Sequence, residues 1–182
     1  MVALEPSFCP TCGTELTART VEDRSRSYCP SCDDIVWRNP VPTASVAVVD
    51  DTGPALSVLL VRRSQPPDAG EWGLPAGFIE HDESAVDAAA RELHEETALA
   101  VDPAALTLAD VGSFVHPSGR PLVTICYAVR RDRTTGEPVA GSDADAVRFW
   151  TLEAISDADE TLRSYDRDRI SRGVERLPAR DI

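Results

Sequence analysis

Residues 77–99 read GFIEHDESAVDAAARELHEETAL, and this stretch decides how the chain folds. Ser84 followed by Asp87 is typical of a capping box, which satisfies free N–H groups at the start of a helix. Small or apolar side chains then recur at helical spacing, at Val86, Ala89, Ala90, Leu93 and Thr97. The pattern predicts a helix from about Ser84 to Thr97 that buries one stripe of its surface.

The same helix carries three glutamates beside its buried stripe, Glu92, Glu95 and Glu96. Residues three and four apart are neighbours on a helix, and like charges at that spacing repel by about 0.2–0.5 kcal/mol per pair. Because glutamate is a good helix former, a solvated face is the alternative interpretation. A cation such as Mg²⁺, which takes carboxylate and phosphate oxygens as ligands, would offset the repulsion. Phosphate chemistry is therefore the first hypothesis.

The spacing of these residues resembles the Nudix box, Gly-x5-Glu-x7-Arg-Glu-(aliphatic)-x-Glu-Glu-x-Gly-(aliphatic), at every specified position but one. Ala98 stands where the family has glycine. In the family this glycine ends the helix at positive φ, so Ala98 implies about 1 kcal/mol of strain or a rearranged turn. Nudix hydrolases split nucleoside diphosphates linked to another group. The resemblance covers the chain from about Pro40 onward.

The resemblance also implies a role for each acid of the motif. Glu92 and Glu96 would ligate the metal directly, together with the backbone carbonyl of Ala76, and Glu95 would bind directly or through water. Two or more Mg²⁺ or Mn²⁺ ions would clamp a diphosphate, neutralise developing charge and make a bound water nucleophilic near neutral pH.

Further residues would support this chemistry. By the same resemblance Arg91 and Glu83 form a pair that orients the carboxylates, a task that metal sites commonly require. A base must take the proton of the attacking water. Glu96 is one candidate, and in related enzymes an acid from a later loop is another. Here Asp143 and Asp145, before Phe149 and Trp150, occupy the comparable stretch.

The composition sets broad limits on the protein. Its 182 residues, 42% of them hydrophobic, can form one good core and a small appendage. The net charge of −13 argues against a nucleic-acid surface, and all 18 basic residues are arginine, a balance that resembles proteins of halophilic organisms. No apolar run is long enough to span a membrane and no secretory signal is evident, so we expect a cytoplasmic protein with no membrane partner.

Two Cys-x2-Cys pairs lie near the N-terminus, Cys9 with Cys12 and Cys29 with Cys32, separated by sixteen residues. This is the spacing of a four-cysteine zinc site, whose closed coordination shell serves structure rather than catalysis. Two disulfides are the alternative, which the lack of a signal peptide disfavours. We therefore expect a zinc ribbon at 1–36 with a polar hairpin tip at 19–27. Cys126, inside a strand-like run, reads as a buried thiol.

The rest of the chain, 37–182, reads as the hydrolase domain. Strands are expected at 43–49, 55–62, 106–115, 122–130 and 147–151, with a turn at 117–121 and a helix from about 158 to 175. Periodicity alone indicates only α/β or α+β. The resemblance implies the α/β/α sandwich of the Nudix family, a mixed sheet faced on both sides by helices and preceded by the zinc ribbon.

A zinc ribbon before such a domain resembles the NADH pyrophosphatase group and ribbon-bearing FAD and ADP-ribose pyrophosphatases. The stretch 113–119 lacks the tryptophan and most of the prolines of the NADH group, and Pro117 is similar to a proline of the ADP-ribose class. Candidate substrate contacts are few. Arg63 ends a strand where the family often binds phosphate, and the aromatic candidates are Trp37, Phe114 and His116. Trp37 could equally pack against the domain, and Trp72 reads as core.

The leading hypothesis is a metal-dependent hydrolase of ADP-ribose, FAD or NAD(H) that releases AMP and a phosphorylated product. The alternative from another class is a catalytically weak nucleotide-binding or protein-docking module, for which Ala98 is the sole support. RNA decapping or RNA binding is disfavoured by the charge. A homodimer is a further expectation about partners.

Overall fold

The computed structural model of this chain describes residues 3–141, 143–157 and 160–177. By its internal contacts the chain divides into two compact units. One comprises the residues up to Val41 together with Phe114–Leu122, and the other comprises Pro42–Ser113 and the residues from Val123 onward. The division into domains at 36/37 stays a prediction, and the two units are described separately.

The first unit holds a three-stranded antiparallel sheet, β1 (Thr17–Val21), β2 (Arg24–Cys29) and β3 (Asp34–Val36). Glu22 and Asp23 join β1 to β2 with φ values of 50° and 59°, and two consecutive positive φ angles are the geometry of the tightest hairpin turns. The predicted hairpin is confirmed, but its turn is limited to Glu22 and Asp23, and the rest of the predicted tip at 19–27 lies in β1 and β2. Cys9, Cys29 and Val36 form a small buried cluster with Leu16 against it.

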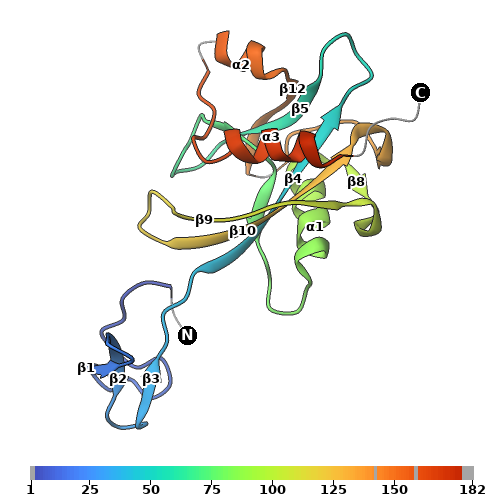
Figure 1. The fold of residues 1–182 in the computed structure, drawn as a ribbon. Coiled ribbons are helices and arrows are strands. Elements are labelled where there is room, and N and C mark those ends of the chain that lie inside the picture. The colour runs from blue at the N-terminus through green and yellow to red at the C-terminus, as the bar shows by residue number, and fades with distance from the viewer. Residues whose placement is uncertain (1–2, 142, 158–159, 178–182) are drawn as a thin grey trace. The chain divides into compact units, whose positions relative to one another are not determined.

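The second unit is built on a sheet in the order β12-β5-β4-β10-β9, with β6 beside β5 and β7 beside β4 (Figure 1). The strands are β4 (Val41–Asp50), β5 (Ser57–Arg63), β6 (Trp72–Gly73), β7 (Ala76–Phe78), β9 (Thr107–Val115), β10 (Pro121–Arg130) and β12 (Ala144–Trp150). A separate pair joins β8 (Ala100–Val101) to β11 (Thr134–Thr135), and two 3-10 turns are η1 (Pro103–Ala105) and η2 (Arg131–Arg133). The predicted strands are confirmed, although β12 begins three residues earlier than expected.

Alternation along β4 explains why helices cover both faces of this sheet. Side chains of a strand point alternately to opposite faces. Val46 and Val48 pack in one buried cluster with Leu93 of α1 (Ala85–Thr97), whereas Ala47 and Val49 pack in another with residues of α2 and α3. The long runs of buried residues in β4 and β5 are what a sheet covered on both faces requires. The predicted α/β sandwich with a mixed sheet is confirmed (Figure 1).

Helix α1 begins and ends as the sequence predicts. Ser84 is its N-cap and accepts a hydrogen bond from the Asp87 N–H at 3.3 Å. Ala98 ends it with φ 58° and ψ 7°, and its N–H donates to the His94 carbonyl at 2.8 Å. Alanine thus takes the left-handed conformation that the family assigns to glycine, at a steric cost. The strain, rather than a rearranged turn, is what the structure contains.

The prediction of a helix from 158 to 175 is wrong for the first part of that range. The structure has α2 at Leu152–Asp157 and α3 at Arg167–Arg176, with residues 160–166 outside any helix. The reason is non-local pairing, because Leu162 forms a parallel bridge with Trp72. Residues 158–159 and the expected frayed end after Leu177 lie outside the described residues. Within the described ranges, no helix has both the length and the apolarity that a membrane crossing requires.

Trp72 and Cys126, which the sequence predicts to be buried, are buried in the structure. Trp72 is 3% exposed, and its ring meets that of Trp150 edge to face at 5.3 Å between centroids. Cys126 is fully buried, and burial raises the pKa of its thiol to about 11. This thiol therefore stays protonated at neutral pH.

Candidate active site

Arg91 is the centre of the acidic patch on α1. Its Nε and Nη2 donate to both oxygens of Glu83 at 3.0 and 2.6 Å. Its Nη1 donates to Glu92 at 2.7 Å and to Glu95 at 3.0 Å, and Nη2 also donates to the Phe78 carbonyl at 3.0 Å. The paired, planar geometry of a guanidinium suits this bidentate contact. One side chain thus holds three carboxylates and ties them to the end of β7.

Glu83 is the anchor of this arrangement. Its carboxylate accepts from Arg91 and from the Glu80 N–H at 2.9 Å. The hydrogen bonds from Arg91, followed by the one from Glu80, hold the pKa of Glu83 below its ordinary value. Arg91 in turn has its pKa raised, chiefly by its hydrogen bond with Glu83. Both groups remain charged across the physiological range of pH.

Glu96 has different surroundings from the other acids. Only 8% of the residue is exposed, and its Oε2 accepts a 3.0 Å hydrogen bond from the Ala76 N–H. Burial raises the pKa of Glu96 to about 7, and the Ala76 N–H and the charge of Arg163 act in the opposite direction. A buried carboxyl group of this kind holds its proton to a higher pH than a carboxyl group in water does.

Glu92 lies against the strand that precedes the helix. A Cβ atom placed on Gly77 would overlap the Glu92 carboxylate. Glycine at this first position of the motif therefore makes room for the acid. Desolvation is the main cause that raises the pKa of Glu92, and the hydrogen bond from Arg91 opposes it.

The donor set fits a hard divalent cation. Glu92 lies against Gly77 and Glu96 accepts from Ala76, so two carboxylates one turn apart on α1 meet neighbouring residues of β7. Mg²⁺ and Mn²⁺ take oxygen ligands of this kind. Within the described residues, only the four cysteines have three or more ligand atoms all within 4.8 Å of one another. Glu92 and Glu95 are drawn toward Arg91 and Glu96 toward Ala76.

Comparison with known proteins identifies the family. The model of the NUDIX domain matches residues 39–172, which include the whole acidic helix and the strands around it. The chain belongs to the NUDIX family.

Similar sequences among curated proteins match only in part. An octanoyltransferase of Myxococcus xanthus is 44% identical over 92 residues, which are 49% of this chain and 26% of that protein. The phosphatase NudJ of Escherichia coli K12 is 33% identical over 93 residues, which are 51% of this chain and 59% of NudJ. The chain thus spans less than two thirds of the length of either relative.

Solved NUDIX structures are similar over more of the chain. A NUDIX hydrolase of Nitrosomonas europaea has a TM-score of 0.70 and 25% identity, covering 93% of this chain and 91% of that one. The NUDIX domain of Shewanella oneidensis NrtR, solved in complex with ADP ribose, has a TM-score of 0.61 and 26% identity, covering 83% of this chain and 94% of that one.

Arg63 lies near the NUDIX acids, whereas the later aspartates have other partners. Arg63 ends β5, and its charge weakly opposes the burial that raises the pKa of Glu96. Asp145 binds Arg62 at 2.7 Å, and Arg62 points to the opposite face of β5 from Arg63 because neighbours in a strand alternate. Asp143 is exposed, and its carbonyl accepts from the N–H and hydroxyl of Ser64, both at 3.0 Å.

The aromatic candidates belong to the first unit and are described there. Trp37 is 45% exposed, and the Arg26 guanidinium lies 5.3 Å from its ring centroid. Phe114 is half-buried at the end of β9. His116 is half-buried, with its Nδ1 2.8 Å from the Ser118 hydroxyl. A contact of these residues with substrate stays a prediction.

The four cysteines of the first unit lie together. Their sulfurs are all within 4.8 Å of one another, with 4.0 Å between Cys9 and Cys32 and 3.5 Å between Cys12 and Cys29. All are free thiols, and these separations far exceed the roughly 2.05 Å of a disulfide. Zn–S bonds of about 2.3 Å in a tetrahedron place sulfurs about 3.8 Å apart. The cluster is therefore compatible with a zinc ribbon.

Three residues near the NUDIX motif escaped the sequence analysis, Gly73, Arg163 and Asp166. A Cβ atom on Gly73 would overlap the Arg163 guanidinium, and Arg163 and Asp166 both contact the Leu74 main chain. The last two lie within the range predicted as a helix, where a charged residue reads as part of the solvated face, so the local pattern did not identify their contacts with Leu74. The glycine between Trp72 and Leu74 indicated that another group approaches the chain closely there. It did not indicate that this group is the Arg163 side chain.

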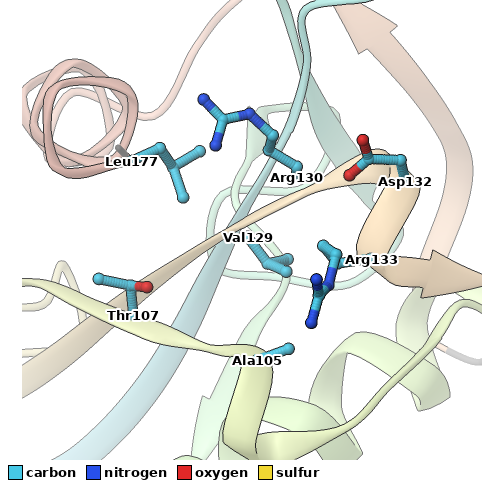
Figure 2. Close-up of a pocket in the computed structure, with 7 residues that line it drawn as sticks. All are labelled: Ala105, Thr107, Val129, Arg130, Asp132, Arg133 and Leu177. Carbon is cyan, nitrogen blue, oxygen red and sulfur yellow. The ribbon is translucent and has the colours of Figure 1, made fainter. Parts of the chain in front are cut away.

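A cavity of about 300 Å³ lies elsewhere in the second unit (Figure 2). Its lining consists of Ala105, Thr107, Val129, Arg130, Asp132, Arg133 and Leu177, and includes none of the predicted site residues. Arg130, beside it, already pairs with Asp51 at 3.0 Å. The cavity therefore gives no support to a second catalytic site.

Proposed function

We propose that this NUDIX protein is a divalent-metal-dependent hydrolase that cleaves the diphosphate of a nucleoside diphosphate derivative, to AMP and a phosphorylated product. The observation that carries the proposal is the hydrogen-bonded set around Arg91, which holds Glu83, Glu92 and Glu95 while Ala76 holds Glu96. Arg91 offsets part of the repulsion among these four carboxylates, but one arginine leaves an excess of negative charge, which a bound cation would neutralise.

Each residue of this set has a defined task. Glu92 and Glu96 with the Ala76 carbonyl would hold Mg²⁺ or Mn²⁺, and Glu95 would bind it directly or through water. When bound, the cation supplies Lewis-acid chemistry that stabilises charge on the diphosphate and lowers the pKa of water. Arg91 and Glu83 would orient the acids, and Arg63 would meet a substrate phosphate. Glu96 is our candidate base, because Asp145 is engaged by Arg62.

ADP-ribose is the substrate that we place first among ADP-ribose, FAD and NAD(H). Its support is the NrtR NUDIX domain, which was solved with ADP ribose and is 26% identical to this chain. The nucleotide-binding or docking alternative rested on Ala98. That residue ends the helix with the left-handed conformation expected of glycine, so it gives the alternative no structural support.

Further properties belong to the same proposal. The four cysteines would hold one structural Zn²⁺, for which their clustering and free thiols are the support. The acidic, lysine-free composition supports activity at high salt, since screening reduces self-repulsion. A cytoplasmic location and a homodimer complete the proposal.

A turnover screen tests the function directly. ADP-ribose, NADH, FAD, diadenosine polyphosphates and nucleoside triphosphates are incubated with the protein and Mg²⁺ or Mn²⁺, and AMP release is quantified by chromatography. We expect AMP from ADP-ribose, with loss of activity when the divalent cation is removed. Tight binding of ADP-ribose with no product from any of these compounds would instead establish the binding-module alternative.

A further inference from the structure

Residues 161–166 are joined to Trp72 and Leu74, just before the NUDIX motif, by four hydrogen bonds. Two are main-chain bonds, from the Trp72 N–H to the Thr161 carbonyl and from the Arg163 N–H to the Trp72 carbonyl, both at 2.8 Å. Two come from side chains. Arg163 Nη2 donates to the Leu74 carbonyl at 2.6 Å, and the Leu74 N–H donates to Asp166 Oδ2 at 3.0 Å. The side chains of Arg163 and Asp166 thus bond to the Leu74 main chain, next to the main-chain hydrogen bonds at Trp72.

This side-chain pair is buried and closely packed. The side chain of Arg163 is 9% exposed and that of Asp166 2%, with Arg163 Nε 3.0 Å from Asp166 Oδ2. Gly73 has no Cβ at the point where the guanidinium passes. Arg169 Nη1 contacts the other oxygen of Asp166 at 3.1 Å. Burying charged groups is costly unless they have close partners, and Arg163 and Asp166 are held by each other and by the Leu74 main chain.

Only Pro75 separates Leu74 from Ala76, which contacts Glu96. Pro75 follows, and its ring restricts φ, so the segment cannot easily absorb a displacement of Leu74. Ala76 comes next, donating its N–H to Glu96 at 3.0 Å. Its carbonyl is also the main-chain ligand that the motif implies.

We propose that Arg163 and Asp166 are positioning residues of the candidate active site, which hold the Leu74 main chain so that Ala76 presents its N–H to Glu96 and its carbonyl to the cation. The inference rests on the proposed function, since it assigns a role toward the same cation. It adds two residues outside the NUDIX motif, from a segment more than sixty positions further along the chain.

Titration of the protein with Mn²⁺ alone tests this role without substrate. Binding is monitored by the loss of the EPR signal of free Mn²⁺. We expect Arg163→Met to weaken Mn²⁺ binding by about 10–100-fold, the usual cost of losing a group that orients a ligand. The direction is diagnostic.

Removing a positive charge near a cation site strengthens binding by direct electrostatics. The Arg163 charge also opposes the burial that raises the pKa of Glu96, so its loss would favour protonation of that ligand near neutral pH, and the titration is therefore repeated at a pH well above the Glu96 pKa of about 7. Weakening that persists there indicates that the ligands have moved.

Arg169→Met is the matched control, because it removes an arginine from the same buried cluster, from the other oxygen of Asp166. We expect its Mn²⁺ affinity to stay within about twofold of the parent, at a temperature where both variants are folded by circular dichroism. Arg163→Lys keeps the charge but cannot contact Leu74 and Asp166 as a planar fork does, so its affinity should fall between those of the parent and Arg163→Met.

The outcomes separate this inference from the proposed function. The positioning role would be overturned if both Arg163 variants bound Mn²⁺ with the affinity of the parent, or if Arg169→Met weakened binding as much as Arg163→Met does. Neither result affects the hydrolase proposal, which is tested by the turnover of the parent protein. A parent that binds Mn²⁺ but releases no AMP removes the hydrolase proposal alone. A parent that binds no Mn²⁺ removes both.

Discussion

The Ala76 N–H donates a 3.0 Å hydrogen bond to Oε2 of Glu96, joining the strand before the NUDIX motif to the last turn of its helix. This bond fixes the buried carboxylate relative to the backbone. Glu96 differs in this respect from Glu92 and Glu95, the other two glutamates of the helix, which both accept hydrogen bonds from Arg91.

Glu96→Gln should abolish most of the turnover and leave the fold intact. Glutamine keeps the size, the helix propensity and an oxygen that accepts from Ala76, but it removes the charge that a cation requires. We expect the rate of AMP release at saturating Mg²⁺ to fall at least about a hundredfold, with an unchanged circular dichroism spectrum. A variant that hydrolyses its best substrate at close to the parental rate would refute the metal assignment.

The same variant should change how stability depends on pH. The pKa of Glu96 is raised from 4.5 to about 7 in the folded protein, so the folded state keeps a proton that the unfolded chain loses. The contribution of Glu96 to stability is complete below pH 4.5 and is lost as pH rises toward 7, by at most about 3 kcal/mol.

Urea unfolding without added Mg²⁺ measures this difference. Glu96→Gln and the parent should have similar free energies of unfolding near pH 4.5, and the variant should be the more stable near pH 7.5. Other titrating groups cancel in the comparison, because both proteins contain them. A constant difference across this range would show that Glu96 titrates in the folded protein as it does in the unfolded chain.

Local sequence patterns predicted helix α1 correctly. Downstream of α1 the prediction was partly wrong, because the structure there depends on contacts between residues far apart in the chain. Ser84, Leu93 and Thr97 specify the start and buried face of α1 through neighbours three or four residues away. Arg163 and Asp166 instead act on Leu74, about ninety residues earlier, in a segment whose polar composition resembles any surface stretch. Their partners exist only after the sheet has formed, so no window of sequence contains the information.

Ala98→Gly should stabilise the protein without changing activity. Ala98 has φ 58°, where an L side chain is strained and glycine is not, and the gain is partly offset by the greater freedom of glycine in the unfolded chain. We expect about 0.5–1 kcal/mol more stability in urea unfolding. Ala90→Gly, inside the same helix, is the control and should cost about 1 kcal/mol. Destabilisation by both changes would show that the helix end does not require positive φ.

Cys12→Ser should remove zinc from the protein. The four sulfurs lie within 4.8 Å of one another, and loss of one thiolate from a closed shell lowers metal affinity strongly. Elemental analysis should find about one zinc per parent chain and almost none in the variant. Cys126→Ser, which changes a buried thiol of the second unit, should keep its zinc. Parent protein that is folded and reduced but free of zinc would contradict the assignment.

Gly77→Ala should lower activity with little effect on stability, because its Cβ would occupy the position of the Glu92 carboxylate. That carboxylate ends a flexible side chain, so the helix can keep its place while the acid rotates away. A displaced ligand typically costs about 10–100-fold in metal affinity or activity. We therefore expect a rise in the Mg²⁺ concentration needed for half-maximal AMP release, with a melting temperature close to that of the parent.

Gly53→Ala is the matched control for this change. Gly53 lies in the turn between β4 and β5, where an added Cβ would meet only the Ala55 carbonyl, at an ordinary 3.8 Å. Both variants add one methyl group at a glycine whose φ is not positive, so they differ in what the methyl group meets. If Gly77→Ala and Gly53→Ala require the same Mg²⁺ concentration, the position of Glu92 beside Gly77 does not govern metal binding. If only Gly77→Ala is impaired and extra Mg²⁺ restores its rate, the glycine at the head of the motif serves the cation through Glu92.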